Sequence, residues 1–284
     1  MFFGKNNIGD RMEIRTDLIS EENLQSTDVK TEKREINGVQ LEITDIKSKS
    51  LASRLKKPCG KYCTIRFGRL DTLADTLPVK KALLSAMKEL LQNNNDNAMI
   101  VGLGNSEITP DALGPMSANM VIATRHISGE LKEALDLKGL HSVSCLTPGV
   151  LGKTGIEAFD IIKATVSKTK PDIVVAIDAL AARTAENLCR TIQITDSGIA
   201  PGSGVKNERK ELSEATLGVP VIALGIPTVI DANCLLGELN ARENLMVTPK
   251  EIDLLINKAA AIISRAINMF FQPALDEETI ESLS

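Results

Sequence analysis

Two aspartates follow apolar stretches of the chain, at positions where an α/β sheet would present them to solvent. Asp178 comes directly after the apolar run 173–177, and Asp111 follows the shorter run 98–101 across a loop that contains two glycines. Loops at the carboxyl ends of strands can carry polar groups while the sheet holds them rigidly. Two carboxyls held together there share a proton, so one can act as a general base toward water and the other as a general acid. The pattern therefore predicts an aspartate pair able to hydrolyse peptide bonds.

A structural role for each aspartate is the alternative interpretation. Thr109 and Pro110 are typical of a helix start, which places Asp111 in a first turn, where a carboxylate accepts hydrogen bonds from backbone N–H groups. Asp178 could cap the turn after its strand in the same way. Taken without other information, the pattern favours these structural roles over a catalytic pair.

The stretch Gly152-Lys153-Thr154 indicates a rival function, because it is similar to the end of a phosphate-binding loop. Asp178 would then imitate the magnesium-holding aspartate of a nucleotide hydrolase. However, the opening glycine of such a loop would fall at Thr147, and the proline after it has a fixed φ and no N–H to offer a phosphate. A nucleotide-binding regulator that uses this loop is kept as an alternative.

The composition argues against several classes of partner. The formal net charge is only −4, so no strong field attracts nucleic acid or an anionic membrane. No continuous apolar run reaches the roughly 18 residues of a membrane span, and the charged N-terminus lacks the apolar core of a secretory signal. We therefore expect a cytoplasmic protein with neither nucleic acid nor a membrane as its partner.

Histidine and cysteine offer little material for catalysis. The two histidines, His126 and His141, leave little for a histidine-based metal site or triad. The five cysteines are an odd number, and the only close pair, Cys59 and Cys63, matches neither the common zinc spacing nor the common redox spacing. We expect free thiols, no metal and no other cofactor, so a hydrolase built from this chain must rely on carboxylates.

Short apolar runs alternate with helical stretches between residues 98 and 224, which predicts an α/β fold with a mainly parallel central sheet. Residues 39–46 alternate between apolar and polar, as a half-buried strand would, and residues 62–67 indicate a second strand before this region. The chain of 284 residues fits one large domain.

The two ends of the chain are expected to be loosely held. Residues 1–35 are polar and charged, which favours an extended arm. Near the other end, Thr248 and Pro249 are typical of a helix start, and the helix should run to about residue 269. The acidic segment 276–281 that follows is expected to fray.

Six sequence blocks, in order along the chain, are more specific than any single glycine-rich loop. They are Val-Gly-Leu-Gly-Asn at 101–105, Thr-Pro-Asp-Ala-Leu-Gly-Pro at 109–115, Thr-Pro-Gly-Val at 147–150 leading to Thr-Gly-Ile-Glu at 154–157, Ala-Ile-Asp-Ala-Leu-Ala-Ala-Arg at 176–183, Pro-Gly-Ser-Gly-Val at 201–205 and Asn-Leu-Met-Val-Thr-Pro-Lys-Glu-Ile-Asp at 244–253. Together they resemble the germination proteases of spore-forming bacteria, which degrade small acid-soluble spore proteins.

The resemblance implies a catalytic pair at Asp111 and Asp178, in agreement with the interpretation of the strand ends. It also implies a phosphorylase/hydrolase-like α/β sandwich related to the hydrogenase maturation proteases, assembly as a homotetramer, and a location in the forespore or spore core. Such proteases are made as inactive precursors. The chain departs from the family pattern in the short segment between Asn233 and Asn244, where many family members carry a long insertion. Any regulatory or tetramer contact that this insertion makes in those members is therefore in doubt here.

The N-terminal arm contains Thr16-Asp17-Leu18-Ile19-Ser20-Glu21, which looks like the family's substrate motif. Without the family, the favoured interpretation is an ordinary polar arm. With it, we expect self-cleavage between Asp17 and Leu18, which divides the chain into a propeptide, residues 1–17, and a peptidase domain, residues 18–284. An extended arm suits this role, because a protease draws several residues of backbone into its cleft.

Further candidates could assist the aspartate pair. Arg183 and the loop of Gly202, Ser203 and Gly204 are expected to bind an acidic substrate or the developing oxyanion, as guanidinium and backbone N–H groups can. Arg183 could equally be a solvated helix residue. A metal-dependent endopeptidase on the same fold is a further alternative, because two carboxylates can also bind a metal.

Overall fold

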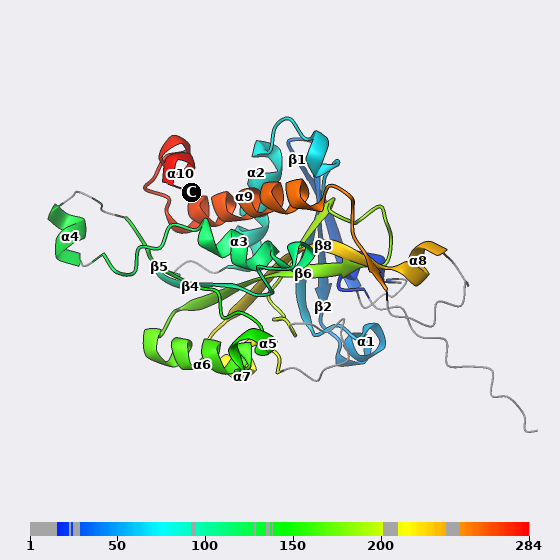
Figure 1. The fold of residues 1–284 in the computed structure, drawn as a ribbon, viewed down its shortest axis with the longest axis horizontal. Coiled ribbons are helices and arrows are strands. Elements are labelled where there is room, and N and C mark those ends of the chain that lie inside the picture. The colour runs from blue at the N-terminus through cyan, green and yellow to red at the C-terminus, as the bar shows by residue number, and fades with distance from the viewer. Residues whose placement is uncertain are drawn as a thin grey trace, which may run out of the picture.

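The computed structural model describes residues 16–22, 24, 29–91, 95–127, 129–134, 137, 139–200, 210–236 and 245–283. Within these residues one nine-stranded sheet runs through the molecule in the order β1-β2-β3-β7-β8-β6-β4-β5, and β9 pairs with β8 (Figure 1). The strands are β1 (Val29–Ile36), β2 (Val39–Ile46), β3 (Gly60–Arg66), β4 (Asn97–Gly102), β5 (Ser142–Leu146), β6 (Ile173–Ala182), β7 (Thr191–Thr195), β8 (Val221–Asp231) and β9 (Met246–Val247).

The sheet is mixed, so the α/β class is confirmed but the expectation of a mainly parallel sheet is wrong. Strands β5, β4, β6 and β8 run parallel, whereas β1, β2, β3 and β7 form antiparallel pairs, and β7 also pairs antiparallel with β8. Asn37 and Gly38 join β1 to β2 and have φ angles of 51° and 82°. An Asn-Gly pair with positive φ at both residues forms the tight turn that favours a hairpin, and this makes the first strands antiparallel.

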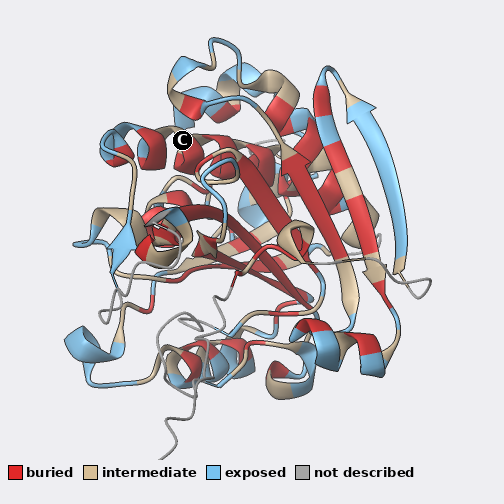
Figure 2. Ribbon diagram, turned by 90° about the vertical axis from the view of Figure 1, so that its right-hand side faces the viewer, coloured by how far each residue is buried: buried red, intermediate tan, exposed pale blue. Residues whose placement is uncertain are grey.

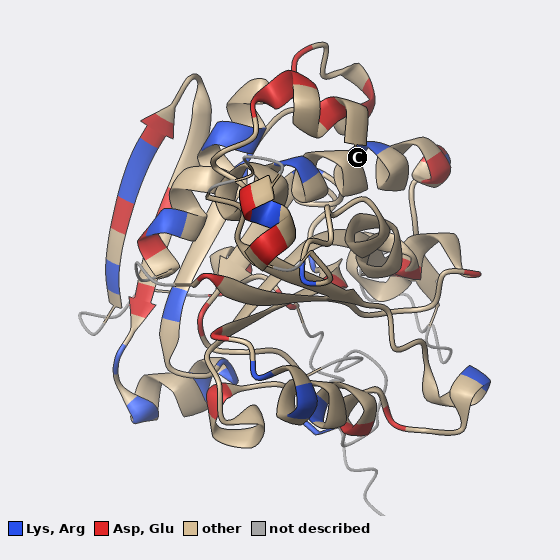
Figure 3. Cartoon of the chain, turned by 90° about the vertical axis from the view of Figure 1, so that its left-hand side faces the viewer, with Lys and Arg blue, Asp and Glu red and all other residues tan. Residues whose placement is uncertain are grey.

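Strand β1 corrects the expectation of a loose arm up to residue 35. It pairs along its whole length with β2, from Val29 opposite Ile46 to Ile36 opposite Val39. Its inner six residues are exposed (Figure 2), and all of them except Thr31 are lysine, arginine or glutamate, as the colours of Figure 3 show. Charged residues on an edge strand discourage pairing with other chains, so the polar composition that suggested a loose arm is that of a protected sheet edge.

Helices cover both faces of the sheet (Figure 1). The helices are α1 (Lys49–Leu55), α2 (Leu77–Leu90), α3 (Leu113–Asn119), α4 (Gly129–Ala134), α5 (Leu151–Thr154), α6 (Ala158–Thr169), α7 (Glu214–Leu217), α8 (Ala232–Leu236), α9 (Ile252–Phe271) and α10 (Glu277–Leu283). On β6, Val175 and Ile177 pack with α2, α3 and α9, whereas Val174 and Ala176 pack with α6 and α7. This alternation explains why β6 is a continuous apolar run.

Helix α9 is the main core helix of the layer that also contains α2 and α3. Its 20 residues are long and apolar enough to cross a bilayer, but 61% of the apolar window is buried inside the molecule. Ile256, Ile263 and Ile267 are at most 1% exposed and face the sheet. The predicted start is close to the observed one, and the helix runs two residues further than expected, to Phe271.

The acidic C-terminal segment forms α10 instead of fraying. Asp276 accepts a hydrogen bond from the Thr279 backbone N–H at 2.8 Å, and Ile280 is 1% exposed. The Glu277 carboxylate pairs with the buried Lys80 ammonium at 2.6 Å. The carboxylates that suggested a solvated tail therefore hold the helix start and compensate a buried cation.

Replacing Ile280 with alanine should lower the free energy of unfolding by about 2–4 kcal/mol, because loss of a fully buried side chain would leave a cavity. Urea unfolding measures the change. Leu283→Ala is the matched control, since Leu283 is 60% exposed and its loss should change stability by less than about 0.5 kcal/mol. Equal effects of the two substitutions would contradict docking of α10.

Candidate active site

Asp178 lies inside β6 rather than at its end, because the strand continues to Ala182. Strand β8 accompanies β6 over this extension, but β4 stops where Gly102 lies opposite Ile177. Asp178 is therefore the first residue of β6 beyond the end of β4. It is 8% exposed, and its carboxylate accepts a hydrogen bond from the Ala179 N–H at 2.9 Å.

Asp111 ends a 3-10 turn, Thr109–Asp111, in the loop that follows β4. Its carboxylate accepts a hydrogen bond from the Asn105 N–H at 2.8 Å, so it holds the two ends of this loop together. Gly104 has a φ of +112°, and a side chain there would come within 2.1 Å of the Asp111 carbonyl oxygen. Gly104 thus allows a tight loop that folds back onto Asp111.

Backbone contacts join the segments that carry the two aspartates. The Leu103 N–H donates to the Ile177 carbonyl at 2.8 Å. Gly114, at the start of α3, lies so close to both residues that an added Cβ would be 2.2 Å from the Leu103 oxygen and 2.4 Å from the Ile177 oxygen. On the other side, the Thr228 hydroxyl donates to the Pro110 carbonyl at 2.7 Å. The structure therefore fixes the Asp111 loop against the β6 backbone that precedes Asp178.

The N-terminal segment 16–22 is docked on the edge of β6 that β4 leaves free. The Asp17 N–H donates to the Ala181 carbonyl at 3.0 Å, and the Ala181 N–H donates to the Asp17 carboxylate at 2.7 Å. Leu18 and Ile19 are fully buried, and Leu18 packs against Leu180. The expectation of an extended arm is wrong here, because this segment folds into a short turn, Ile19–Glu21.

Two polar residues hold the docked segment, and neither was singled out for this role from the sequence. The buried Gln193 amide donates to the Asp17 carbonyl at 2.8 Å and accepts from the Ile19 N–H at 2.7 Å. Lys57 donates to the Thr16 carbonyl, and burial lowers the pKa of its ammonium. A glutamine inside an otherwise apolar and β-branched strand was the available signal for Gln193.

Arg183 lies against the N-terminal segment, not on a solvated helix. Its guanidinium donates to the Glu21 carbonyl at 2.8 Å and pairs with the Glu22 carboxylate at 3.3 Å. Burial raises the pKa of the Glu21 carboxyl, but hydrogen bonds from Thr16, Asn187 and the backbone of 183 and 184 outweigh it and leave the pKa lowered. Gly202, Ser203 and Gly204, the other predicted binding residues, lie outside the described residues.

The Gly152-Lys153-Thr154 stretch has a local structural role. It lies in α5, where Lys153 pairs with Glu107 and the Thr154 hydroxyl donates to the Ile156 carbonyl at 2.9 Å. No atom lies within 4 Å of a Cβ built on Gly152, so this glycine is not needed for a close backbone approach. A phosphate-binding loop depends on such an approach, and the nucleotide alternative gains no support.

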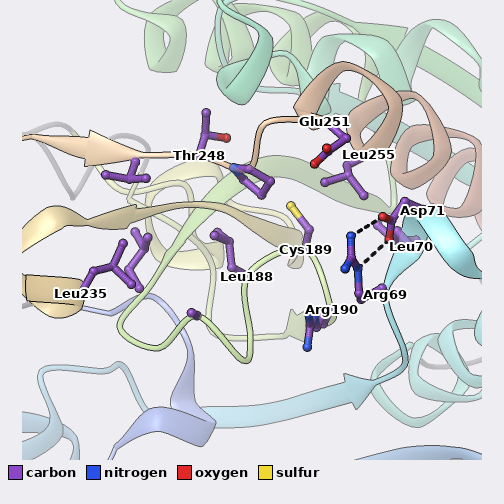
Figure 4. A pocket seen from close by; sticks show the side chains of 14 residues that line it. Arg69, Leu70, Asp71, Leu188, Cys189, Arg190, Leu235, Thr248, Glu251 and Leu255 are labelled. Atoms are coloured by element: carbon purple, nitrogen blue, oxygen red, sulfur yellow. Dashed lines mark hydrogen bonds and ion pairs between the residues drawn. The ribbon is translucent and has the colours of Figure 1, made fainter.

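Cysteines and metal ligands give no second site in the described part of the chain. There, no group of three or more His, Cys, Asp and Glu residues is placed to hold a metal ion. Cys189 lines a cavity of about 290 Å³ beside Arg69 and Leu255 (Figure 4), which includes none of the predicted site residues. Burial raises the pKa of the Cys189 thiol to about 12 and that of Cys145 to about 11, so neither is suited to be a nucleophile.

Comparison with known proteins gives one consistent family. A family model described as germination protease matches residues 10–239. The germination protease of Caldanaerobacter subterraneus subsp. tengcongensis is 40% identical over 95% of this chain and 98% of its own length, and that of Clostridium tetani is 37% identical over 95% and 99%. Both alignments extend over 325 positions, more than the 284 residues of the chain, so both relatives carry residues that have no counterpart here.

Gly114→Ala should destabilise the fold by about 3 kcal/mol, the upper part of the range for overpacking, because its Cβ would meet two backbone oxygens that cannot move independently. Gly152→Ala, where a Cβ meets open space, should leave stability unchanged or raise it by up to about 1 kcal/mol. Urea unfolding of both variants measures this. A harmless Gly114→Ala would show that the contact between the Asp111 loop and β6 is looser than described.

Proposed function

The chain belongs to the germination protease family and is an endopeptidase, and we propose that it cleaves small acid-soluble spore proteins with Asp111 and Asp178 as its catalytic carboxyls. The observation that supports this pair most directly is the packing of the Asp111 loop on the Ile177 carbonyl, the peptide group that precedes Asp178. The two segments that carry the aspartates, distant in the sequence, are thereby in contact through their backbones.

In the proposed mechanism, the two aspartates act on one water molecule. One carboxylate takes a proton from the water as the oxygen attacks the scissile carbonyl, and the other protonates the departing amine. Each aspartate accepts a backbone hydrogen bond, Asp111 from Asn105 and Asp178 from Ala179. A carboxylate has about four acceptor positions, so such a bond can orient the side chain while another position accepts from water.

The chain is proposed to be a zymogen that cleaves itself between Asp17 and Leu18 and works as a homotetramer in the cytoplasm of the forespore or spore. Two features of the docked segment support a latent form. Leu18 is fully buried, and the Asp17 N–H and carboxylate are both bonded to Ala181. A peptide bond must be accessible to be attacked, so Asp17 and Leu18 have to separate from Ala181 and Leu180 before the bond between them is cut.

Asp111→Asn and Asp178→Asn should each keep the fold and lower the rate of cleavage of a small acid-soluble spore protein by at least about 10²–10⁴-fold, the range for a lost general acid or base. The amide oxygen of asparagine can still accept the backbone hydrogen bond. Asp160→Asn is the control, because Asp160 is an exposed residue of α6 that pairs with Lys210. Full activity of either site variant would refute the pair.

Gln193→Ala should speed self-cleavage by about tenfold, because it removes two hydrogen bonds that keep the segment docked. Intact-mass measurements over time should show loss of residues 1–17, with Leu18 as the new N-terminus. Gln40→Ala, on the exposed face of β2, should process at the unmodified rate. A mature end at another residue would overturn the assigned cleavage site.

A further inference from the structure

The side chain of Glu21 accepts hydrogen bonds from a group of donors in the connection from β6 to β7. One carboxylate oxygen accepts from the Thr184 N–H at 2.9 Å, the Thr184 hydroxyl at 2.9 Å and the Asn187 amide at 2.8 Å. The other oxygen accepts from the Arg183 N–H at 2.6 Å and from the hydroxyl of Thr16. Four of these five donors belong to residues 183–187, and we call them the carboxylate receptor.

The carboxylate receptor is arranged by its own segment, independently of Glu21. The Asn187 N–H donates to the Thr184 carbonyl at 3.2 Å, which closes the turn. The Thr191 hydroxyl donates to the Asn187 amide oxygen at 3.1 Å, so the amide nitrogen is turned toward Glu21. Donors fixed in advance bind their ligand at a smaller cost in conformational entropy, and this arrangement is that of a binding site.

The receptor is chemically selective for glutamate. A carboxylate offers only acceptors, whereas glutamine would direct an NH₂ group at a set of donors and leave at least one of them without its acceptor. Aspartate is shorter by one methylene and could not reach the same donors from the same backbone position. Hydrogen bonds to a charged acceptor are also stronger than neutral ones.

The position of Glu21 relates the receptor to the proposed cleavage. If Leu18 is the first residue after the cut, Glu21 is the fourth. The docked segment follows β6 from Ala181, which Asp17 contacts, to Arg183 and Thr184, which Glu21 contacts. Leu18 packs on Leu180, which lies two residues beyond Asp178 on the same strand and therefore on the same face, at a spacing of about 7 Å.

We propose that Thr184, Asn187 and the backbone N–H groups of Arg183 and Thr184 form the subsite that selects a glutamate four residues after the cleaved bond, and that the chain's own Glu21 occupies this subsite until a substrate displaces it. The inference rests on the proposed cleavage between Asp17 and Leu18. Glu21 stays on the mature chain after that cut, so self-cleavage alone does not empty the receptor. A tethered occupant competes at a high effective concentration, and it should weaken the apparent affinity for substrates.

The test uses the full chain with Asp178→Asn, so that binding is measured without turnover. The probe is a fluorescein-labelled peptide with the sequence of residues 16–22, and its binding is followed by fluorescence anisotropy at pH 7. Adding Glu21→Ala to the chain should strengthen binding at least about tenfold, because the receptor is vacated. On this chain, a probe with glutamine in place of the glutamate at position 21 should bind at least about tenfold more weakly, and Asn187→Asp should remove the preference for glutamate.

The peptide with glutamine in place of the glutamate at position 22 is the matched control and should bind within about twofold of the parent, because Glu22 contacts the Arg183 guanidinium and not the receptor. The subsite is overturned if the parent peptide and the peptide with glutamine at position 21 bind with equal affinity. It is also overturned if a folded Glu21→Ala chain does not bind the peptide. If the Asp178→Asn chain prefers the glutamate peptide but still cleaves it, the subsite is supported and the aspartate pair is refuted. If cleavage requires Asp178 but proceeds equally well with glutamate or glutamine at position 21, the aspartate pair is supported and the subsite is refuted.

Discussion

The site depends on the close approach of Gly114 to the carbonyl oxygens of Leu103 and Ile177, which leaves no room for a side chain at position 114. Here the chain leaves β4, turns back, and starts α3 directly against the neighbouring strand. Gly102 has the same constraint from the other side, because a Cβ there would lie 2.3 Å from the Gly114 oxygen. Any larger residue at these positions would push the Asp111 loop away from β6. Catalytic geometry is sensitive to displacements of about 1 Å, so the proposed aspartate pair depends on this contact.

The unequal lengths of two neighbouring strands create the environment of the site. Strand β6 continues to Ala182, whereas β4 ends at Gly102, so the N–H and carbonyl groups of β6 beyond Asp178 lack a partner from β4. Backbone groups of this kind need hydrogen bonds, and Asp17 supplies them at Ala181. The open edge of β6 thus accepts the chain's own N-terminal segment.

The sequence was most informative where hydrophobic periodicity or a local signal determines the structure. Strand β2 and the start of α9 follow from alternation and from the Thr248-Pro249 pair, and both are observed near their predicted positions. The charged pattern of β1 led to a wrong prediction, because an edge strand exposed on both faces has the composition of a loose arm. Its clearest signal was local: the Asn37-Gly38 turn.

Of the candidate site, the sequence predicts the two aspartates, which stay a proposal, but not the contacts around them. Asp111 and Asp178 are marked by their place after apolar runs, whereas Arg183 was assigned to a substrate and is observed on the N-terminal segment. Thr184 and Asn187 follow β6 in a polar stretch without a recognisable motif, and their function depends on a residue at the other end of the chain. Contacts over such separations leave no local pattern, so only the folded structure could reveal them.

The order of synthesis gives the docked N-terminal segment a further property. Its partners on β6, β7 and the connection between them follow it by 161 to 176 residues. At ribosomal rates of about 5–20 residues per second, they emerge roughly 10–30 seconds after it. During that interval the segment lacks its partners on β6 and β7, and the growing chain also lacks Asp178. That part of the docking surface and the second carboxyl of the proposed pair are therefore made at nearly the same moment, so under the proposed mechanism a nascent chain does not acquire the pair before the segment can dock on β6.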